Sequence, residues 1–148
     1  MSAGRAVAGA ALAACLATAC VGPSRTDDDY RAKAANTAEA VRSSVGTARL
    51  AVRAADEKRA FGPYLTRLLA EAEEDALAAQ QAFDSVQPPS ERADHVHDDL
   101  DDLVTEALDA LRELRVTVRR GEYAHLAENA AALAKVSDEL AAFEEHPS

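Results

Sequence analysis

Residues 63–86 read PYLTRLLAEAEEDALAAQQAFDSV. Apolar or small side chains recur here at alternating spacings of four and three residues without a break, at Leu65, Leu69, Ala72, Ala76, Ala79, Phe83 and Val86. This period brings them onto one side of an α-helix and leaves charged and amide side chains on the other. Pro63 suits the first turn, where its missing N–H is not needed. The stretch predicts one long amphipathic helix that must bury a single face.

Three further stretches repeat this pattern, and Gly or Pro residues separate them. They predict helices over 27–60, 90–120 and 122–145. Three aspartates at 27–29 offer a cap for the first of these helices, and Gly121 offers a stop for the second. The expected inward positions are Tyr30, Ala34, Thr37, Val41, Val45, Ala48, Val52 and Ala55, then Val96, Leu100, Leu103, Ala107, Leu111, Leu114 and Val118, then Leu126, Ala130, Leu133, Val136, Leu140 and Phe143.

Four helices with short connections favour an antiparallel, up-down-up-down four-helix bundle. No segment alternates polar and apolar residues over the length of a useful strand. Abundant alanine, leucine, glutamate and arginine also favour helix. The sequence therefore predicts an all-α fold with one bundle domain over residues 27–146.

The N-terminus has the layout of an export signal. Residues 1–19 carry one positive charge, Arg5, followed by an uncharged run that ends in small residues. That run is shorter than the roughly 20 apolar residues that span a bilayer. The small-polar-small-Cys sequence Ala17-Thr18-Ala19-Cys20 resembles the lipobox of bacterial lipoproteins, and the chain resembles small uncharacterised helical lipoproteins of actinobacteria.

The resemblance implies that signal peptide 1–19 is removed, that Cys20 carries the lipid, and that residues 20–26 form a lipidated anchor and short linker. It implies a protein on the extracytoplasmic face of the cell membrane. A competing match ends at Cys15, but it leaves a very short apolar run after Arg5. An ordinary signal peptide with incidental cysteines is the other reading.

Charge and composition exclude some classes of partner and of chemistry. The formal net charge is −10, and phosphate binding by a nucleic-acid-binding protein needs a basic face. The chain has two cysteines, both in the N-terminal twenty residues, and it lacks the glycine turns of nucleophile elbows and phosphate loops. We therefore expect neither nucleic-acid binding, nor enzymatic activity, nor a cofactor.

Two groups of residues resemble metal sites only in part. The first is an acidic run with two histidines, and helix geometry spreads its side chains over different faces: His95, His97, Asp98, Asp99, Asp101 and Asp102. The second is Glu122-Tyr123-Ala124-His125, a Glu-x-x-His sequence of the kind that di-iron bundles use in pairs. The chain has one copy, at a helix start. Neither group predicts a metal centre.

Aromatic and basic residues gather at the bundle end opposite the anchor. We expect an interaction surface there, made of Phe61, Tyr64, Arg119, Arg120 and Tyr123. The predicted function is therefore a membrane-anchored interaction or structural domain whose partners are the membrane, through the lipid, and another envelope protein. The alternative is an extracytoplasmic bundle that binds a ligand or metal, through the acidic run or through the basic end.

Overall fold

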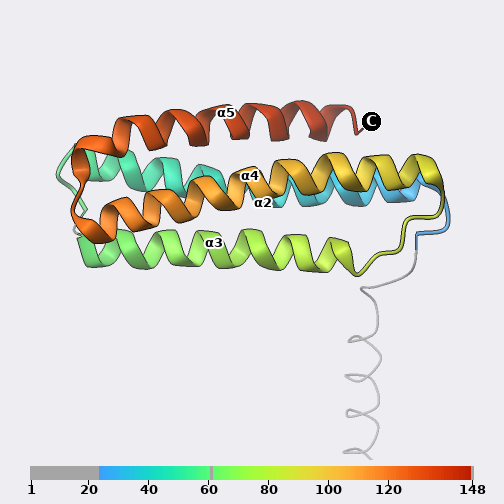
Figure 1. The fold of residues 1–148 in the computed structure, drawn as a ribbon, viewed down its shortest axis with the longest axis horizontal. Coiled ribbons are helices and arrows are strands. Elements are labelled where there is room, and N and C mark those ends of the chain that lie inside the picture. Colours follow the sequence, from blue (N-terminus) through green and yellow to red (C-terminus); the bar gives the residue numbers. More distant parts are fainter. Residues whose placement is uncertain (1–23, 61, 148) are drawn as a thin grey trace, which may run out of the picture.

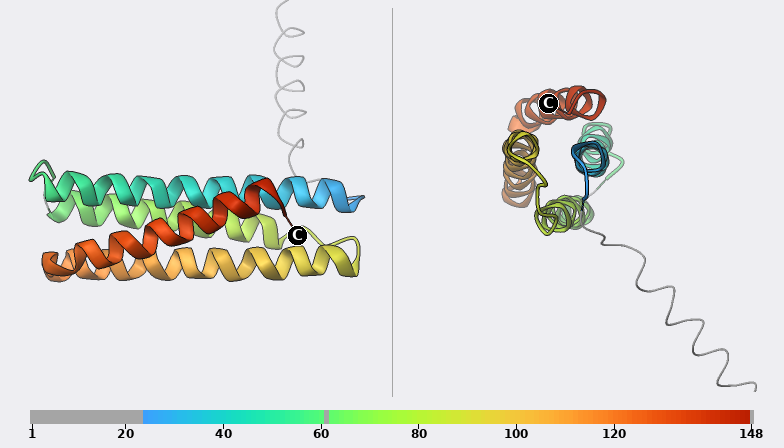
Figure 2. Two further views of the ribbon diagram at one scale, coloured as in Figure 1. Left: turned by 90° about the horizontal axis from the view of Figure 1, so that it is seen from above. Right: turned by 90° about the vertical axis from the view of Figure 1, so that its right-hand side faces the viewer.

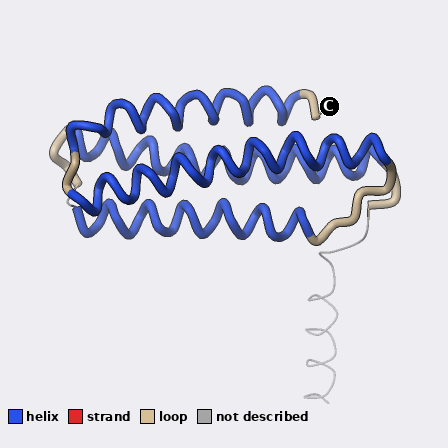
Figure 3. Tube along the Cα trace, in the orientation of Figure 1, coloured by secondary structure: helices blue, strands red, loops and turns tan. Residues whose placement is uncertain are grey.

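The computed structural model describes residues 24–60 and 62–147. Within them the chain forms long helices α2 (Asp27–Asp56), α3 (Gly62–Asp84), α4 (Glu91–Arg120) and α5 (Leu126–Glu145), with a short 3-10 helix η1 (Tyr123–His125) before α5. Short loops join the helices, and the described part contains no strand (Figures 1 and 3). The all-α prediction is confirmed.

Consecutive helices run antiparallel and form the predicted four-helix bundle. Helix α2 contacts α3 and α5 as neighbours and also reaches α4 across the diagonal, whereas no contact joins the described residues of α3 and α5. The view along the bundle in Figure 2 shows the helices at four corners. We call the end where α2 and α4 begin the near end, and the end where α3 and α5 begin the far end.

The inward faces form the core that the spacing predicted. The positions predicted within 63–86 are buried except Ala79, which is half-buried, and Val86 is buried although α3 ends before it, at Asp84. In α4, Val104 is fully buried and Leu103 is only half-buried, although Leu103 was the predicted inward residue. The cause is that α4 contacts three helices, so its buried face is wider than a single stripe. Likewise Ala38 of α2 is buried beside a half-buried Thr37.

Hydroxyl side chains cap both helices that begin at the near end. Thr26 Oγ1 accepts a hydrogen bond from the Asp29 N–H at 3.1 Å, so Thr26, and not an aspartate, is the N-cap of α2. Ser90 Oγ accepts from the Ala93 N–H at 3.3 Å and donates to Asp27 Oδ1 at 2.7 Å. The Ser90 hydroxyl therefore ties the start of α4 to the first turn of α2.

Helix α2 ends at Asp56, before the predicted Ala60, because the backbone turns left-handed at Lys58, with φ of 57°. The Lys58 N–H donates to the Ala55 carbonyl at 2.9 Å and the Arg59 N–H to the Ala54 carbonyl at 2.8 Å. This pair of bonds is a Schellman motif. Gly121 ends α4 in the same way, with φ of 72°.

Helix α5 is shorter than its neighbours, and its end stops short of the near end. It has 20 residues against 30 in α2, and it lies obliquely across the bundle (Figure 2). The Arg42 guanidinium contacts Glu144 at 2.9 Å, so the end of α5 is level with the middle of α2. Phe143, the residue before Glu144, therefore lies level with the middle of α2 and away from Tyr30 at its start. No helix within residues 24–60 and 62–147 has both the length and the apolarity to cross a membrane.

Candidate functional site

The far end brings together most of the predicted interaction surface. Arg119, Arg120 and Tyr123 line an open hollow of about 470 Å³ together with Gly62 and Pro63. The remaining lining residues are Thr66, Val118 and Gly121. Tyr64 does not line this hollow, although it directly follows the lining residue Pro63 and is 62% exposed. Phe61, the fifth predicted residue, lies outside the described residues.

Local backbone geometry positions this far-end hollow. The left-handed turn at Gly121 stops α4 and places Arg119 and Arg120 in its last turn, where positive charge complements the helix dipole. The Tyr123 hydroxyl lies against the backbone of Gly62, so close that a Cβ at Gly62 would be 3.0 Å from it. Neither arginine has an ion-pair or hydrogen-bond partner among the described residues. The hollow can therefore accept an anionic group.

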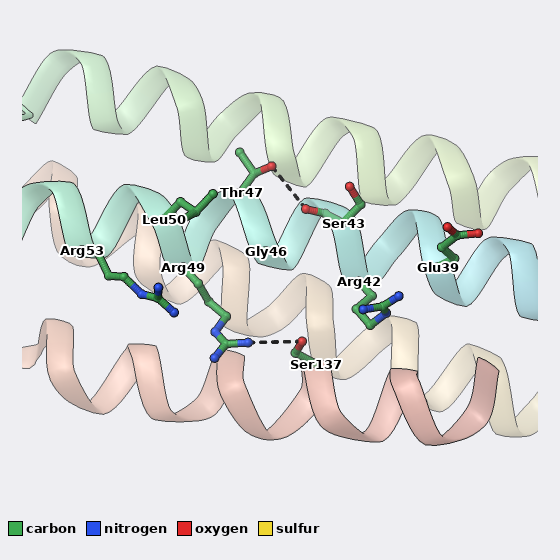
Figure 4. A pocket seen from close by; sticks show the side chains of 9 residues that line it. All are labelled: Glu39, Arg42, Ser43, Gly46, Thr47, Arg49, Leu50, Arg53 and Ser137. Atoms are coloured by element: carbon green, nitrogen blue, oxygen red, sulfur yellow. Dashed lines mark hydrogen bonds between the residues drawn. The ribbon is translucent and has the colours of Figure 1, made fainter. Parts of the chain in front are cut away.

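A larger hollow lies along the side of α2, where the sequence alone did not lead us to expect one. We call it the arginine groove, and its volume is about 550 Å³. It is lined by Glu39, Arg42, Ser43, Gly46, Thr47, Arg49, Leu50 and Arg53 of α2 and by Ser137 of α5 (Figure 4). In Figure 4 the three arginine side chains extend on the side of α5, and Leu50 and Thr47 lie on the side of α3.

The three arginines of the groove differ in how they are neutralised. Arg42 is paired, with its Nε at 3.0 Å and its Nη2 at 2.9 Å from Glu144 Oε2. Arg49 donates a hydrogen bond to Ser137 Oγ at 3.4 Å and contacts no carboxylate in the described part of the chain. The Arg53 guanidinium makes neither a hydrogen bond nor an ion pair there. Two guanidinium groups of the groove are thus available to an acidic ligand.

A sequence signal for the groove existed. Arg42, Arg49 and Arg53 are spaced seven and four residues apart, which places them on one side of a helix. They lie outside the apolar stripe of this helix, whereas the predicted interaction surface uses only basic residues at the end of the bundle.

The predicted acidic run does not converge on one point. His97 lies 3.5 Å from Asp84 Oδ1 through its Nε2 and 3.8 Å from Asp98 Oδ1 through its Nδ1. Asp101 instead accepts a hydrogen bond from Gln80 at 2.7 Å, and His95, Asp99 and Asp102 are exposed. Across residues 24–60 and 62–147, no three His, Cys, Asp or Glu side chains are grouped as metal ligands would be.

Below this acidic run, Tyr30 is buried in an unusual way. Its ring contacts Phe83 at 5.0 Å between centroids, and Phe83 stacks on His97 at 5.7 Å. The Tyr30 hydroxyl is buried without a hydrogen-bond partner among the described residues. Burial, and then the charges of Asp94, Asp84 and Asp98, raise the pKa of Tyr30 to about 12.

The Glu-x-x-His sequence does not project into the core. Glu122 and His125 are both exposed around η1, and His125 Nδ1 lies 3.8 Å from Glu128 Oε2 on the surface. Cys15 and Cys20 both lie outside the described residues. No known family model, curated protein or solved structure matches this chain.

Proposed function

We propose that this chain is a lipid-anchored, extracytoplasmic protein whose helical domain acts by binding, most simply to another envelope protein. The anchor would be Cys20, and residues 1–19 would be removed on export. The observation that supports this proposal best is the polarity of the bundle. The first described residue, Ser24, lies at the near end of the bundle. The unpaired Arg119 and Arg120 lie with Tyr123 at the far end.

The length of the bundle sets the distance between its near and far ends. Helix α2 has 30 residues, which corresponds to about 45 Å at 1.5 Å per residue. A lipid on Cys20 would sit a few residues before the start of α2. The far-end hollow would then be held well away from the lipid attachment point, where a partner could reach it.

The interior of the domain supports a binding role over a catalytic one. The buried polar residues in the described part are Ser24, Ser44, Thr117 and Ser137. Ser44 donates to the Ala40 carbonyl within α2, and Thr117 of α4 accepts a hydrogen bond from Asn129 of α5, so both hydroxyls are used in holding the bundle together. None of the four is paired with a buried histidine or carboxylate that could activate it. Recognition would therefore take place on the outer surface.

The anchor is tested by replacing its thiol. Cys20→Ser is expected to release the protein into the medium or to leave an uncut precursor, because stable membrane attachment needs the acyl chains. Cys15→Ser is the matched control and should stay on the membrane at the processed size. Fractionation with mass spectrometry of the N-terminus reads out both variants. A Cys20→Ser protein that stays on the membrane at the processed size would contradict the proposal.

The binding role is tested by crosslinking in intact membranes, followed by identification of the captured protein. Arg119→Glu combined with Arg120→Glu should lose that protein if the far-end hollow is the contact. Arg31→Glu combined with Arg92→Glu, which reverses two charges near the other end, should retain it. Calorimetric titration with polyphosphate tests the second candidate function, the binding of an anionic ligand. Only that function predicts a heat of binding that Arg119→Glu combined with Arg120→Glu abolishes.

A further inference from the structure

We propose that the arginine groove is a docking site for an acidic helical segment of a partner protein. This inference goes beyond the anchor and the far-end hollow, and it does not depend on whether Cys20 is lipidated. It rests on the charge, shape and exposed apolar surface of one face of α2.

The charge of the groove is unusual for this chain. The chain carries a net charge of −10, and midway along the bundle Arg112 and Arg115 are neutralised by Glu73, at 3.1 and 2.8 Å. In the groove, Arg49 and Arg53 contact no carboxylate in the described residues. They are four residues apart and therefore one helical turn apart on the same side. A partner with two carboxylates at matching spacing would complement both.

The shape of the groove favours close approach of another helix. Gly46 is in the middle of α2, where glycine weakens a helix relative to alanine. A Cβ placed on Gly46 would meet nothing within 4 Å, so packing inside this chain does not require glycine there. Ser43 and Thr47 flank it with small side chains. This face would let a second helix lie directly along the α2 backbone.

An exposed leucine adds an apolar contact beside the charges. Leu50 is 63% exposed, and it follows Gly46 by one turn on the rim of the groove. Figure 4 shows the arginines on one side of Gly46 and Leu50 on the other. A docking helix would therefore carry acidic side chains toward the arginines and an apolar side chain toward Leu50. An amphipathic acidic helix meets both requirements.

Other occupants fit the groove less well. Residues 1–23 of this chain contain no acidic side chain, so they cannot neutralise the arginines. A second copy could offer the exposed acids of α4, but α4 lies diagonally across the bundle from α2. Such a contact would be head-to-tail and would form closed rings or open chains of several copies. An anionic polymer or bilayer would use the arginines but would leave Leu50 without a specific role.

The experiment is a selection on the purified full-length protein with an unbiased display library of helical peptides. We expect enriched peptides to carry two acidic residues four positions apart and a leucine or isoleucine on the adjacent side of the helix. The same selection on Arg49→Glu combined with Arg53→Glu should not enrich them. Arg112→Glu combined with Arg115→Glu is the matched charge control and should enrich them as the unmodified protein does, provided that circular dichroism shows it folded.

Single substitutions then test the shape argument with the strongest peptide, measured by fluorescence anisotropy. Gly46→Leu should weaken binding by about tenfold or more, because the added side chain would occupy the contact face. Leu50→Ala should weaken it by a smaller factor. Gly46→Ala serves as the folding control, since the structure has room for its methyl group.

Several outcomes would overturn the proposal. One is a library that yields no peptide, or peptides without acidic residues. Another is peptide binding that is unaffected by the double arginine reversal. Tight binding of polyphosphate or of phosphatidylglycerol vesicles that depends on Arg49 and Arg53 but not on Leu50 would assign the groove to an anionic polymer or surface. Sedimentation that shows rings or growing chains of this protein, abolished by the same reversal, would assign it to a second copy.

Discussion

At the scale of single residues, Tyr30 combines complete burial with an unpartnered hydroxyl. A hydroxyl transferred from water without a hydrogen bond costs about 1–3 kcal/mol as judged from protein mutations. The aromatic contacts with Phe83 and the apolar body of the ring offset this cost. The hydroxyl is therefore the least favourable part of an otherwise well-packed side chain.

The raised pKa of Tyr30 predicts a loss of stability at alkaline pH. Between the ordinary value of 10 and the folded value of about 12, the unfolded chain has released the phenol proton and the folded chain retains it. Ionisation thus favours the unfolded state, and the free energy of unfolding should fall as pH rises from 10 to 12 by up to about 3 kcal/mol. Below pH 10 this contribution is constant.

Tyr30→Phe removes both effects. We expect this variant to be about 1 kcal/mol more stable near neutral pH, because the unpartnered hydroxyl is gone, and to lose stability less steeply above pH 10. Urea unfolding followed by circular dichroism across this range measures both quantities. If the free energy of unfolding fell equally steeply with pH in both proteins, the pKa of Tyr30 would not be raised by folding.

At the scale of helices, the sequence predicted what repeats and missed what depends on local backbone geometry. The period in residues 63–86 identified α3 and its buried face because that face is a single stripe. The predicted end of α2 at Ala60 was wrong because the residue that turns left-handed is Lys58, and no glycine marks the turn in the sequence. Helix α5 begins at Leu126, later than the predicted residue 122, because η1 comes first and neither Glu122 nor His125 provides a side-chain cap.

The far-end hollow and the arginine groove likewise differ in how far the sequence could predict them. Arg119, Arg120 and Tyr123 could be predicted to meet because they lie in adjacent helix ends joined by a short turn. The arginine groove includes Ser137 of α5, and one of its three arginines, Arg42, is neutralised by Glu144 of α5. Such pairings join residues far apart in sequence, and spacing within one helix gives no information about them.

The two left-handed helix ends make a matched prediction. Lys58→Gly should raise the free energy of unfolding by about 1 kcal/mol, because a residue with a Cβ is strained at this φ and glycine is not. Gly121→Ala should lower it by about the same amount, although the added methyl would meet no atom within 4 Å. Urea unfolding of the three proteins gives the comparison. An unchanged Lys58→Gly variant alongside a weakened Gly121→Ala variant would place Lys58 outside the left-handed region.

At the scale of the whole molecule, the diagonal contact makes α2 and α4 central. Each contacts the other three long helices, so neither can separate without exposing most of the core. Helices α3 and α5 each pack on these two and not on one another within the described residues. Stability should therefore be distributed unevenly among the helices.

Hydrogen exchange should reveal this distribution. We expect amides in the middle of α2 and α4 to exchange only through global unfolding, with a free energy equal to that from urea. Amides at the start of α5 should exchange fastest among the helices, because η1 is exposed and its start lacks a side-chain cap. The capped starts of α2 and α4 are internal controls and should exchange more slowly. Greatest protection in α3 or α5 would contradict this order.

The inward positions of the helices recur at spacings of three and four residues, and this has a consequence for the reach of the domain. Seven residues are close to two helical turns, so removing or adding one seven-residue repeat in each helix, at the same level of the bundle, would turn the core side chains by only about 20°. Each step would shorten or extend the rod by about 10 Å. The distance between its two tips is thus an adjustable dimension, set by how many repeats are stacked and separable from the chemistry carried at either tip.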